Sequence, residues 1–278
     1  GLRSLRSPAG RRRRFLLGAD RPHRRAARLR GLAERLAKPP ENRSDAAGPA
    51  PRRLLYGRRR GKRLRAGRQA LVDRLLPDLA IEIEGLAPGA LDPRTLFPFQ
   101  VSDVWLEIGF GNGEHLVHQG EANPDIGLLG AEPYLAGVAR MVAHVHERGL
   151  ENVRLHVDDA RLLLTALADA SIGRLFTLFP DPWPKTRHHK RRLVTEATVL
   201  EVARVLAPGA EWRLATDDMG YCRWMLRHLT GRVEFAWLAE GAADWRRRPA
   251  DWPETRYEAK ARASGRAAVF LRFRRRID

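Results

Sequence analysis

The chain of 278 residues contains a single cysteine, Cys222, and no apolar run that approaches the roughly 20 residues of a membrane-spanning helix. One cysteine cannot form an internal disulfide framework and fits a reducing compartment such as the cytoplasm. We expect Cys222 to be an ordinary helix residue, because the sequence supplies no base that would activate it as a nucleophile. With 44% apolar residues the chain can bury a full core, so we expect a soluble globular protein.

Acidic residues are scarce near the N-terminus. Residues 1–68 hold 23 Lys and Arg against 4 Asp and Glu, whereas the remaining 28 basic and 29 acidic residues nearly cancel. The net charge of +18 therefore does not make the rest of the chain a general nucleic-acid binder. We predict a disordered Arg/Ala/Pro-rich extension over residues 1–51 and a basic arm over residues 52–68. The extension could be a targeting peptide, an RNA-contacting tail or upstream sequence from a misplaced start, and we favour the last.

Residues 69–278 alternate short apolar segments with amphipathic ones, which is typical of an α/β domain with a mostly parallel sheet. Strands are expected at residues 104–108, 127–131, 153–157, 175–179 and 212–215, and an antiparallel pair at 233–238 and 267–273. Helices are expected at 69–76, 114–120, 137–147 and 192–206. The last helix should bury one face, formed by Leu193, Ala197, Leu200, Ala203 and Leu206.

A proline-rich loop follows the fourth expected strand, with the sequence Phe179-Pro180-Asp181-Pro182-Trp183-Pro184-Lys185. Three prolines at alternate positions fix the backbone and remove amide donors, so the segment is a stiff loop. The preceding strand delivers Asp181 to an edge of the sheet. A held acid, an aromatic residue and a lysine, followed by a basic run, suit a site that grips a base whose phosphates lie outside. Trp183 could stack on that base or pack within the loop.

A glycine loop follows the first expected strand. Glycines at this place let the backbone approach a ligand, and the next helix offers its N-terminal amides. The motif consists of Glu107, Gly109, Gly111 and Gly113, and it lacks the third glycine placement of the dinucleotide fingerprint. Glu107 would repel a pyrophosphate but suits the ammonium and sulfonium of S-adenosylmethionine. Glu132 can accept both ribose hydroxyls and Asp159 the adenine amino group, so acids at three strand ends favour a methyl donor over NAD.

These residues resemble the bacterial tRNA guanine-N7 methyltransferases, a family of class I S-adenosylmethionine-dependent methyltransferases. The resemblance covers residues 54–274 and is carried by Leu106-Glu107-Ile108-Gly109-Phe110-Gly111-Asn112-Gly113, Phe179-Pro180-Asp181-Pro182-Trp183-Pro184-Lys185, Arg187-His188 with Lys190-Arg191-Arg192, Ala215-Thr216-Asp217 and Thr255-Arg256-Tyr257-Glu258. It implies a Rossmann-like fold: a mostly parallel seven-stranded sheet with an antiparallel edge strand and helices on both faces. The implied reaction transfers a methyl group from S-adenosylmethionine to N7 of guanine 46 in the tRNA variable loop, leaving S-adenosylhomocysteine.

The resemblance also implies roles for individual residues. Around the donor it places Glu107, Gly109, Gly111, Gly113, Glu132, Asp159 and Asp181. Towards the tRNA it places Lys185, Asp217, Thr255, Arg256, Tyr257 and Glu258.

The chemistry of guanine N7 assigns further roles. A carboxylate on the N1–H and N2 edge of guanine would stabilise the cationic product. We take Asp181 as the catalytic residue, while Asp217 and Glu258 stay open for that contact. Lys185 suits a phosphate or an orienting role, since a cation on O6 would withdraw electrons from N7. Phosphate contacts are expected from Arg187, Lys190, Arg191, Arg192 and the cluster at 58–65.

Two other functions stay open. An amino-methyltransferase acting on adenine or cytosine also holds a base with a proline-rich loop, although its loop reads Asp/Asn-Pro-Pro-aromatic. A non-catalytic RNA-binding subunit would keep the fold, but the complete set of acids argues against it. We expect no metal, because His188 and His189 have no further ligand pattern beside them. We further expect tRNA as the partner, no membrane association, and a monomer or weak homodimer in the cytoplasm.

Overall fold

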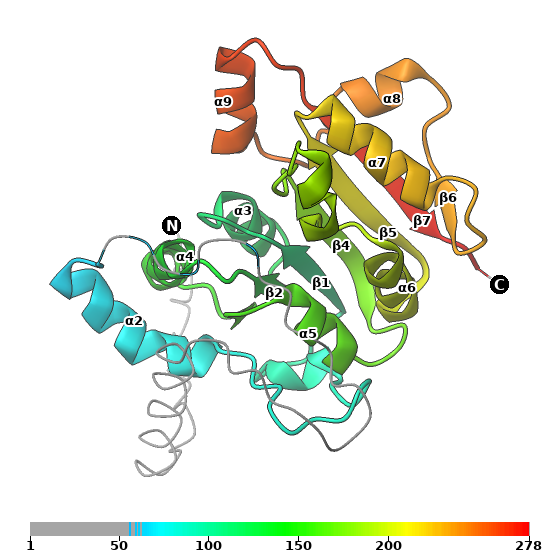
Figure 1. Ribbon diagram of the computed structural model, residues 1–278. Coiled ribbons are helices and arrows are strands. Elements are labelled where there is room, and N and C mark those ends of the chain that lie inside the picture. The colour runs from blue at the N-terminus through cyan, green and yellow to red at the C-terminus, as the bar shows by residue number, and fades with distance from the viewer. Residues whose placement is uncertain (1–55, 57–58, 60, 62, 278) are drawn as a thin grey trace, which may run out of the picture. The chain divides into compact units, whose positions relative to one another are not determined.

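The computed structural model describes Tyr56, Arg59, Gly61 and residues 63–277, all within the compact unit Asp45–Asp278. The predicted extension and most of the basic arm lie outside these residues, so the boundaries at 51 and 68 stay predictions. The core of the unit is a seven-stranded sheet in the order β3-β2-β1-β4-β5-β7-β6 (Figure 1). The strands are β1 (Asp103–Ile108), β2 (Ile126–Ala131), β3 (Val153–His156), β4 (Ile172–Leu178), β5 (Leu206–Thr216), β6 (Phe235–Trp237) and β7 (Val269–Arg275).

The sheet is mostly parallel, as the sequence predicts. Strands β1 to β5 pair in parallel, and β7 pairs antiparallel with both β5 and β6. The antiparallel strand therefore lies one place inside the sheet, and the short β6 forms the edge. Because β1 to β5 point the same way, the residues that follow them gather at one edge of the sheet.

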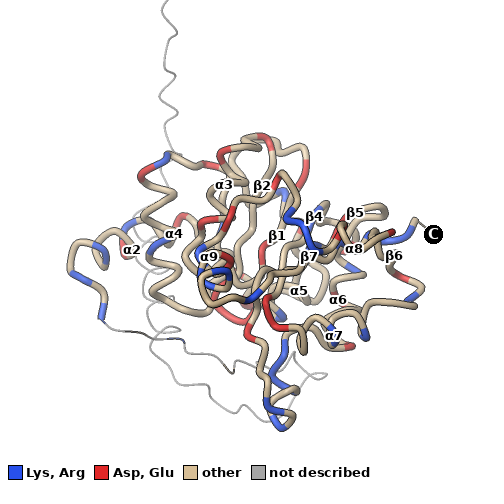
Figure 2. Tube along the Cα trace, turned by 90° about the horizontal axis from the view of Figure 1, so that it is seen from above, with Lys and Arg blue, Asp and Glu red and all other residues tan. Residues whose placement is uncertain are grey.

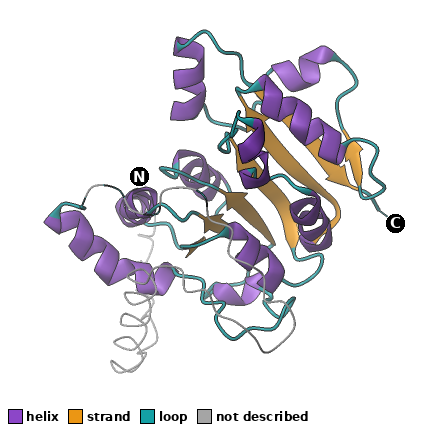
Figure 3. Cartoon of the chain, viewed as in Figure 1, coloured by secondary structure: helices purple, strands orange, loops and turns teal. Residues whose placement is uncertain are grey.

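Helices cover both faces of the sheet (Figure 3). On one face α4 contacts both α2 and α3, and on the other α6 contacts both α5 and α7. The helices are α2 (Ala66–Leu79), α3 (Glu114–Ala122), α4 (Leu135–Arg148), α5 (Ala160–Ala166), α6 (Glu196–Val205), α7 (Met219–Leu229), α8 (Ala242–Arg246) and α9 (Arg256–Ala263), with 3-10 turns η1 (Pro93–Leu96) and η2 (Thr186–Arg191). Four of them confirm the expected helices, with ends shifted by a few residues.

The central strands are covered on both faces, which is why they read as apolar runs. Leu106 in β1, Leu175 in β4 and Leu214 in β5 are completely buried. Each such side chain contributes about 1.5–3 kcal/mol relative to exposure. Trp212 is also fully buried, and its indole N–H donates to Thr177 Oγ1 at 3.1 Å, so its burial leaves no polar atom unsatisfied. This core holds the carboxyl ends of the strands in a fixed arrangement.

The predicted apolar face of α6 was wrong in part, because Ala203 and Leu206 are buried but Ala197 and Leu200 are exposed. The helix begins at Glu196, because Thr195 is extended and its side chain accepts from the Thr198 amide as the N-cap, while η2 ends earlier, at Arg191. Its buried side chains are Thr198, Val199, Val202, Ala203 and Val205, while Leu200 is 47% exposed. The segment has two overlapping sets of small and apolar residues at helical spacing. Tertiary contacts bury the set that contains Val199 and Val202, and they leave Leu200 at the surface.

Candidate functional site

Three of the predicted acids meet at the carboxyl edge of the sheet. Glu132 follows β2, Asp159 follows β3 and Asp181 follows β4, and all three line one cavity of about 420 Å³. A cavity of this volume is within the range of sites for small organic ligands. Parallel strands explain the meeting, since each delivers its last residues to the same edge.

The glycine loop forms one wall of the cavity. Gly109, Gly111 and Gly113 all have positive φ angles, of 78°, 56° and 86°, and the first two line the cavity. Gly113 is the N-cap of α3, where a left-handed backbone is accessible to glycine at little cost. The Gly111 amide donates to Glu132 Oε2 at 2.9 Å, which fastens the loop to the acid of the neighbouring strand.

Glu132 is the most constrained acid of the cavity. It is 9% exposed and accepts from the amides of Gly111 and Tyr134, each at 2.9 Å. Burial raises its pKa, the two amides lower it, and the neighbouring Asp181 and Glu107 raise it further, so the net shift is upward. Among residues 56, 59, 61 and 63–277, no Lys or Arg forms an ion pair with Glu132 or Asp181. This excess of negative charge suits a cationic ligand.

Glu107 lies beside the cavity and not in its lining. It is 3% exposed, and its Oε2 is 2.9 Å from Nδ1 of His115 in α3. Alternation along β1 explains this placement: Ile108 points to the cavity, so the preceding residue points to the other face. Glu107 is still close enough to raise the pKa of Glu132. Its contact with a cofactor stays a prediction.

Asp159 has a local structural partner as well as a place in the cavity. It is the N-cap of α5 and accepts from the Arg161 amide at 3.0 Å. The Arg161 guanidinium, which also lines the cavity, lies 3.3 Å from both Asp159 carboxylate oxygens. The side chain is therefore fixed in orientation, and its contact with an adenine stays a prediction.

The proline loop carries Asp181 to the mouth of the cavity. Phe179 and Trp183 have positive φ angles of 50° and 42°, which are costly for residues with side chains, by about 1–3 kcal/mol each. The Phe179 amide donates to the Ala215 carbonyl at 2.8 Å and anchors the start of the loop on β5. Asp181 and Trp183 line the cavity, whereas Lys185 is exposed outside the lining.

Aromatic side chains complete the cavity wall, and sequence analysis did not predict a place there for Tyr56 or Tyr134. The Arg191 guanidinium lies 5.5 Å from the Tyr56 ring and 4.9 Å from the Trp183 ring, and all three residues line the cavity. Tyr134 and Arg161 also line it without having been predicted. The sequence pattern that could have indicated them is their spacing, since each follows a strand-end acid by two residues.

Tyr257, predicted to face the tRNA, reaches the same cavity from α9. A Cβ placed on Gly111 would lie 3.3 Å from its ring. Burial raises the pKa of Tyr257, and the nearby charges of Glu132 and Asp181 raise it further. This tyrosine therefore adjoins the acids assigned to the donor.

The other residues predicted to face tRNA lie outside the cavity lining. Asp217 pairs with Arg266 at 2.8 Å, and Glu258 pairs with Arg248 at 3.3 Å. Thr255 is the N-cap of α9, where its Oγ1 accepts from the Glu258 amide at 3.2 Å. Arg256 is 68% exposed in its side chain and lies 3.9 Å from Glu114. Their roles stay predictions.

The basic run after the proline loop divides into exposed and buried residues. Arg187 and Lys190 are exposed on η2, as a phosphate contact requires. Arg192 is 3% exposed and makes its contacts inside the protein, so the prediction that it binds phosphate was wrong. Elsewhere, basic and acidic residues are interspersed along the described part of the chain (Figure 2). Within the predicted cluster at 58–65, residues 58, 60 and 62 lie outside the described part.

Comparison with known proteins identifies the family. A family model described as "Putative methyltransferase" matches residues 102–271. The chain is 54% identical over 222 residues to the tRNA (guanine-N(7)-)-methyltransferase of Rhodospirillum rubrum, covering 80% of this chain and 87% of that one. It is 48% identical over 242 residues to the protein of that name from Paramagnetospirillum magneticum, covering 87% and 99%. The chain belongs to the tRNA (guanine-N(7)-)-methyltransferase family.

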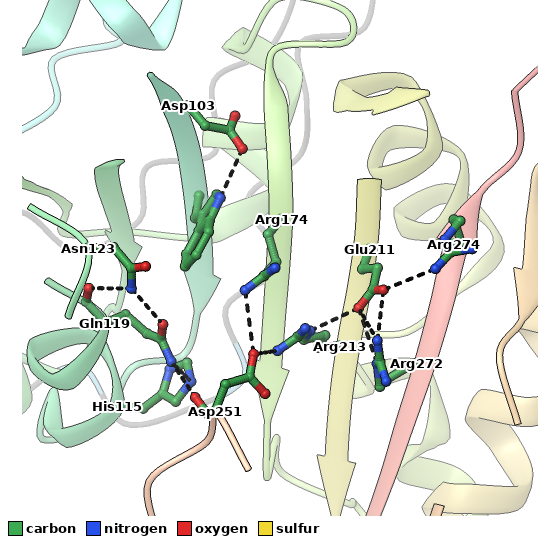
Figure 4. Close-up of polar contacts among 11 residues, drawn as sticks. Asp103, His115, Gln119, Asn123, Arg174, Glu211, Arg213, Asp251, Arg272 and Arg274 are labelled. Carbon is green, nitrogen blue, oxygen red and sulfur yellow. Dashed lines mark hydrogen bonds and ion pairs between the residues drawn. The ribbon is translucent and has the colours of Figure 1, made fainter. Parts of the chain in front are cut away.

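A second group of acids in this family member lies on the sheet face beside β4, β5 and β7 (Figure 4). Glu211 accepts from Arg213 at 3.1 Å and from Arg272 at 2.9 Å, and Arg274 lies 3.6 Å away. Asp251 pairs with Arg213 at 2.5 Å and with Arg174 at 3.7 Å. Burial opposes ionisation of both acids, but the arginines outweigh it and lower both pKa values. These acids are compensated and need no ligand.

Two features are absent from the described residues. No helix among them is both long and apolar enough to cross a membrane. Within the same part of the chain, no three His, Cys, Asp or Glu side chains are grouped so that they could hold a metal ion. Cys222 is buried in α7, and burial raises the pKa of its thiol, which is the reverse of what a nucleophile needs.

Proposed function

We propose that this chain transfers a methyl group from S-adenosylmethionine to N7 of guanine 46 in the variable loop of tRNA. The observation that carries the proposal is the cavity lined by Glu132, Asp159 and Asp181, in which the described residues leave Glu132 and Asp181 without a cationic partner. Its negative charge and its volume suit an adenosyl ligand with a positively charged sulfur. The relatives that carry the name act, by that name, on guanine N7 of tRNA.

The chemistry requires little from the protein beyond placement and charge. Bound S-adenosylmethionine supplies a methyl group on a cationic sulfur. The carbon–sulfur bond breaks as a carbon–nitrogen bond forms at N7, which has a lone pair and no proton, so no general base is needed. S-adenosylhomocysteine leaves, and the positive charge passes to the base. Positioning can supply up to about 7–11 kcal/mol in well-oriented reactions, and a carboxylate near the base stabilises its new charge.

The residues divide between the two substrates. We assign to Glu132 the ribose hydroxyls, to Asp159 the adenine amino group, and to Glu107 the balancing of the donor's charge. Asp181, at the cavity mouth, is the proposed catalytic acid. Residues proposed to contact the tRNA are Lys185, Asp217, Thr255, Arg256, Tyr257 and Glu258. The position of Tyr257 inside the cavity supports a place for it between donor and base.

The decisive experiment supplies methyl-labelled donor with unmodified tRNA, in parallel with a tRNA that contains 7-deazaguanine. Label should enter the first and not the second, because the second has carbon in place of N7. Label in both would exclude N7 as the acceptor. Exposed Glu151, which precedes β3 and is outside the cavity lining, offers a control: Glu151→Ala should retain wild-type turnover.

We also infer a monomer or weak homodimer that needs no metal and works in the cytoplasm. The single cysteine and the tRNA named as substrate of the relatives support that compartment. The mechanism has no step that needs a metal ion. Retention of turnover in a chelator, and a mass by light scattering at the concentration used for the assay, test these inferences.

A further inference from the structure

The side chain of Arg192 closes the base of the proline loop. It stands between η2 and α6 and is 3% exposed. Its Nε donates to the Pro182 carbonyl at 2.8 Å, and its Nη2 lies 3.5 Å from the Trp183 carbonyl. One guanidinium therefore reaches back across ten residues and joins the two ends of the segment that carries Lys185 and the exposed cations.

The guanidinium is itself held by α7. Its Cζ lies 5.0 Å from the centre of the Tyr221 ring and 4.8 Å from that of the Trp224 ring. Arginine suits this place because its planar group can contact aromatic rings while its N–H groups donate sideways to carbonyls. A lysine ammonium cannot reproduce both sets of contacts.

The backbone that follows Arg192 is fixed to the same helix. The Tyr221 hydroxyl accepts from the amides of Leu193 and Val194 at 3.2 and 3.3 Å, and the Trp224 indole N–H donates to the Val194 carbonyl at 2.6 Å. The start of the proline loop is fastened to β5 through the Phe179 amide. Between these anchors, Arg191 contacts the ring of Trp183, and Arg192 holds the backbone through the Pro182 and Trp183 carbonyls.

We propose that Arg192 is a positioning residue that clasps the proline loop and so keeps Asp181 at the cavity. The proposal rests on the proposed function, because Asp181 acts there. It separates Arg192 from Arg187 and Lys190, which share its charge but are exposed. Arg192 holds the loop backbone from inside the protein, whereas Arg187 and Lys190 are free to contact tRNA phosphates.

Three variants test the clasp. Arg192→Lys keeps the charge but loses the planar guanidinium. Arg192→Gln removes the charge, and Lys190→Ala is the matched loss of an exposed cation. For each we would measure turnover at saturating substrates, the affinity for S-adenosylhomocysteine by calorimetry, and tRNA affinity over a range of salt concentrations. Thermal melts would show which variants fold.

A clasp predicts a fall in kcat of about 10- to 100-fold for Arg192→Lys, as expected when a catalytic group is displaced by about 1 Å. The affinity for S-adenosylhomocysteine should stay within about threefold. Arg192→Gln should leave the slope of log K against log salt unchanged, whereas Lys190→Ala should reduce its magnitude by about 0.7–0.9. Wild-type turnover in Arg192→Lys would overturn the proposal, as would a reduced slope in Arg192→Gln. Failure of the unaltered protein to bind S-adenosylhomocysteine would instead refute the proposed function.

Discussion

Two largely buried glutamates in this protein, Glu132 and Glu211, are held in opposite ways. At the cavity, Glu132 is 9% exposed, and its hydrogen bonds come from two backbone amides. On the sheet face, the Glu211 side chain is 13% exposed and contacts three arginines (Figure 4). Burial raises the pKa of Glu132, with Asp181 and Glu107 adding to the shift, whereas the arginines lower the pKa of Glu211.

The contrast separates a binding site from a structural network. Burial of a carboxylate without a cation costs folding free energy, and a folded protein keeps such a group where a ligand will balance it. Burial with arginines satisfies the acid within the fold. Glu132 is therefore set for a cationic ligand, while Glu211 and Asp251 join strands β4, β5 and β7 to the segment that leads to α9.

The largest expected effect is on catalysis and belongs to the cavity. Asp181→Ala should reduce turnover by about 100- to 1000-fold, since it removes the charge that stabilises the methylated base. The affinity for S-adenosylhomocysteine should stay close to that of the unaltered protein, because Asp159 and Glu132 remain. Single-turnover rates and calorimetry measure the two quantities. Equal losses in both would contradict the assignment of Asp181 to the reaction.

On the sheet face, the corresponding change should affect stability. Glu211→Gln leaves Arg213, which is 5% exposed, with Asp251 as its one remaining acid. We expect a loss of about 3 kcal/mol in the free energy of unfolding, in the range for broken buried pairs. Urea titration measures it, and the protein that remains folded should methylate tRNA at the wild-type rate. A loss below about 1 kcal/mol would mean that the network is dispensable.

Glu132→Gln should act on binding. Losing a charged hydrogen-bond acceptor should weaken the affinity for S-adenosylhomocysteine by about 10- to 100-fold, equivalent to about 1.4–2.8 kcal/mol. The free energy of unfolding should change less than in Glu211→Gln, since no buried cation loses its partner. An unchanged affinity would remove Glu132 from the proposed site.

The pKa values of Glu132 and Glu211 are shifted in opposite directions, so pH should affect their contributions to stability in opposite ways. The folded-state pKa of Glu132 is raised, so its contribution to stability is present below the unfolded-state value of about 4.3 and is lost as pH rises through the folded-state pKa. The folded-state pKa of Glu211 is lowered, so its contribution is present above the unfolded-state value and is lost as pH falls through the folded-state pKa.

Melting temperatures from about pH 2.5 to 7 test these signs, because the window of Glu211 lies below its unfolded-state pKa and that of Glu132 lies above it. Glu132→Gln should gain stability relative to the unaltered protein as pH rises, and Glu211→Gln should lose it. Affinity for the cationic donor should also fall on acidification through the raised pKa of Glu132, and this dependence should weaken in Glu132→Gln. Parallel pH curves for the two variants would contradict the comparison.

The sequence was sufficient to predict those parts of the site whose position depends only on the direction of the strands. Glu132, Asp159 and Asp181 each follow a parallel strand, and parallel strands end at one edge, so their meeting follows from the pattern. The seven-stranded sheet and its antiparallel strand followed from the resemblance, although β7 lies inside β6.

Tertiary contacts decided the rest. Glu107 differs from Ile108 by one step of strand alternation, which sends it to His115 and away from the cavity lining. Arg192 reads as one more exposed cation, and only its packing between Tyr221 and Trp224 reveals that it is buried. Tyr257 reaches the cavity from a helix more than seventy residues after the proline loop. Local sequence carries no signal of these distant neighbours.

The smallest expected effect tests whether the ion pairs of Glu211 contribute unequally to the free energy of unfolding. Arg274 is 51% exposed in its side chain and lies 3.6 Å from Glu211, whereas Arg272 donates to the same carboxylate at 2.9 Å. Exposed ion pairs contribute about 0–1 kcal/mol and are screened by salt. Arg274→Gln should therefore cost about 0.5 kcal/mol or less in urea, and nothing at high salt. A cost comparable to that of Glu211→Gln would show that the arginines act as one unit, so that even a rim charge helps to hold β5 and β7 together.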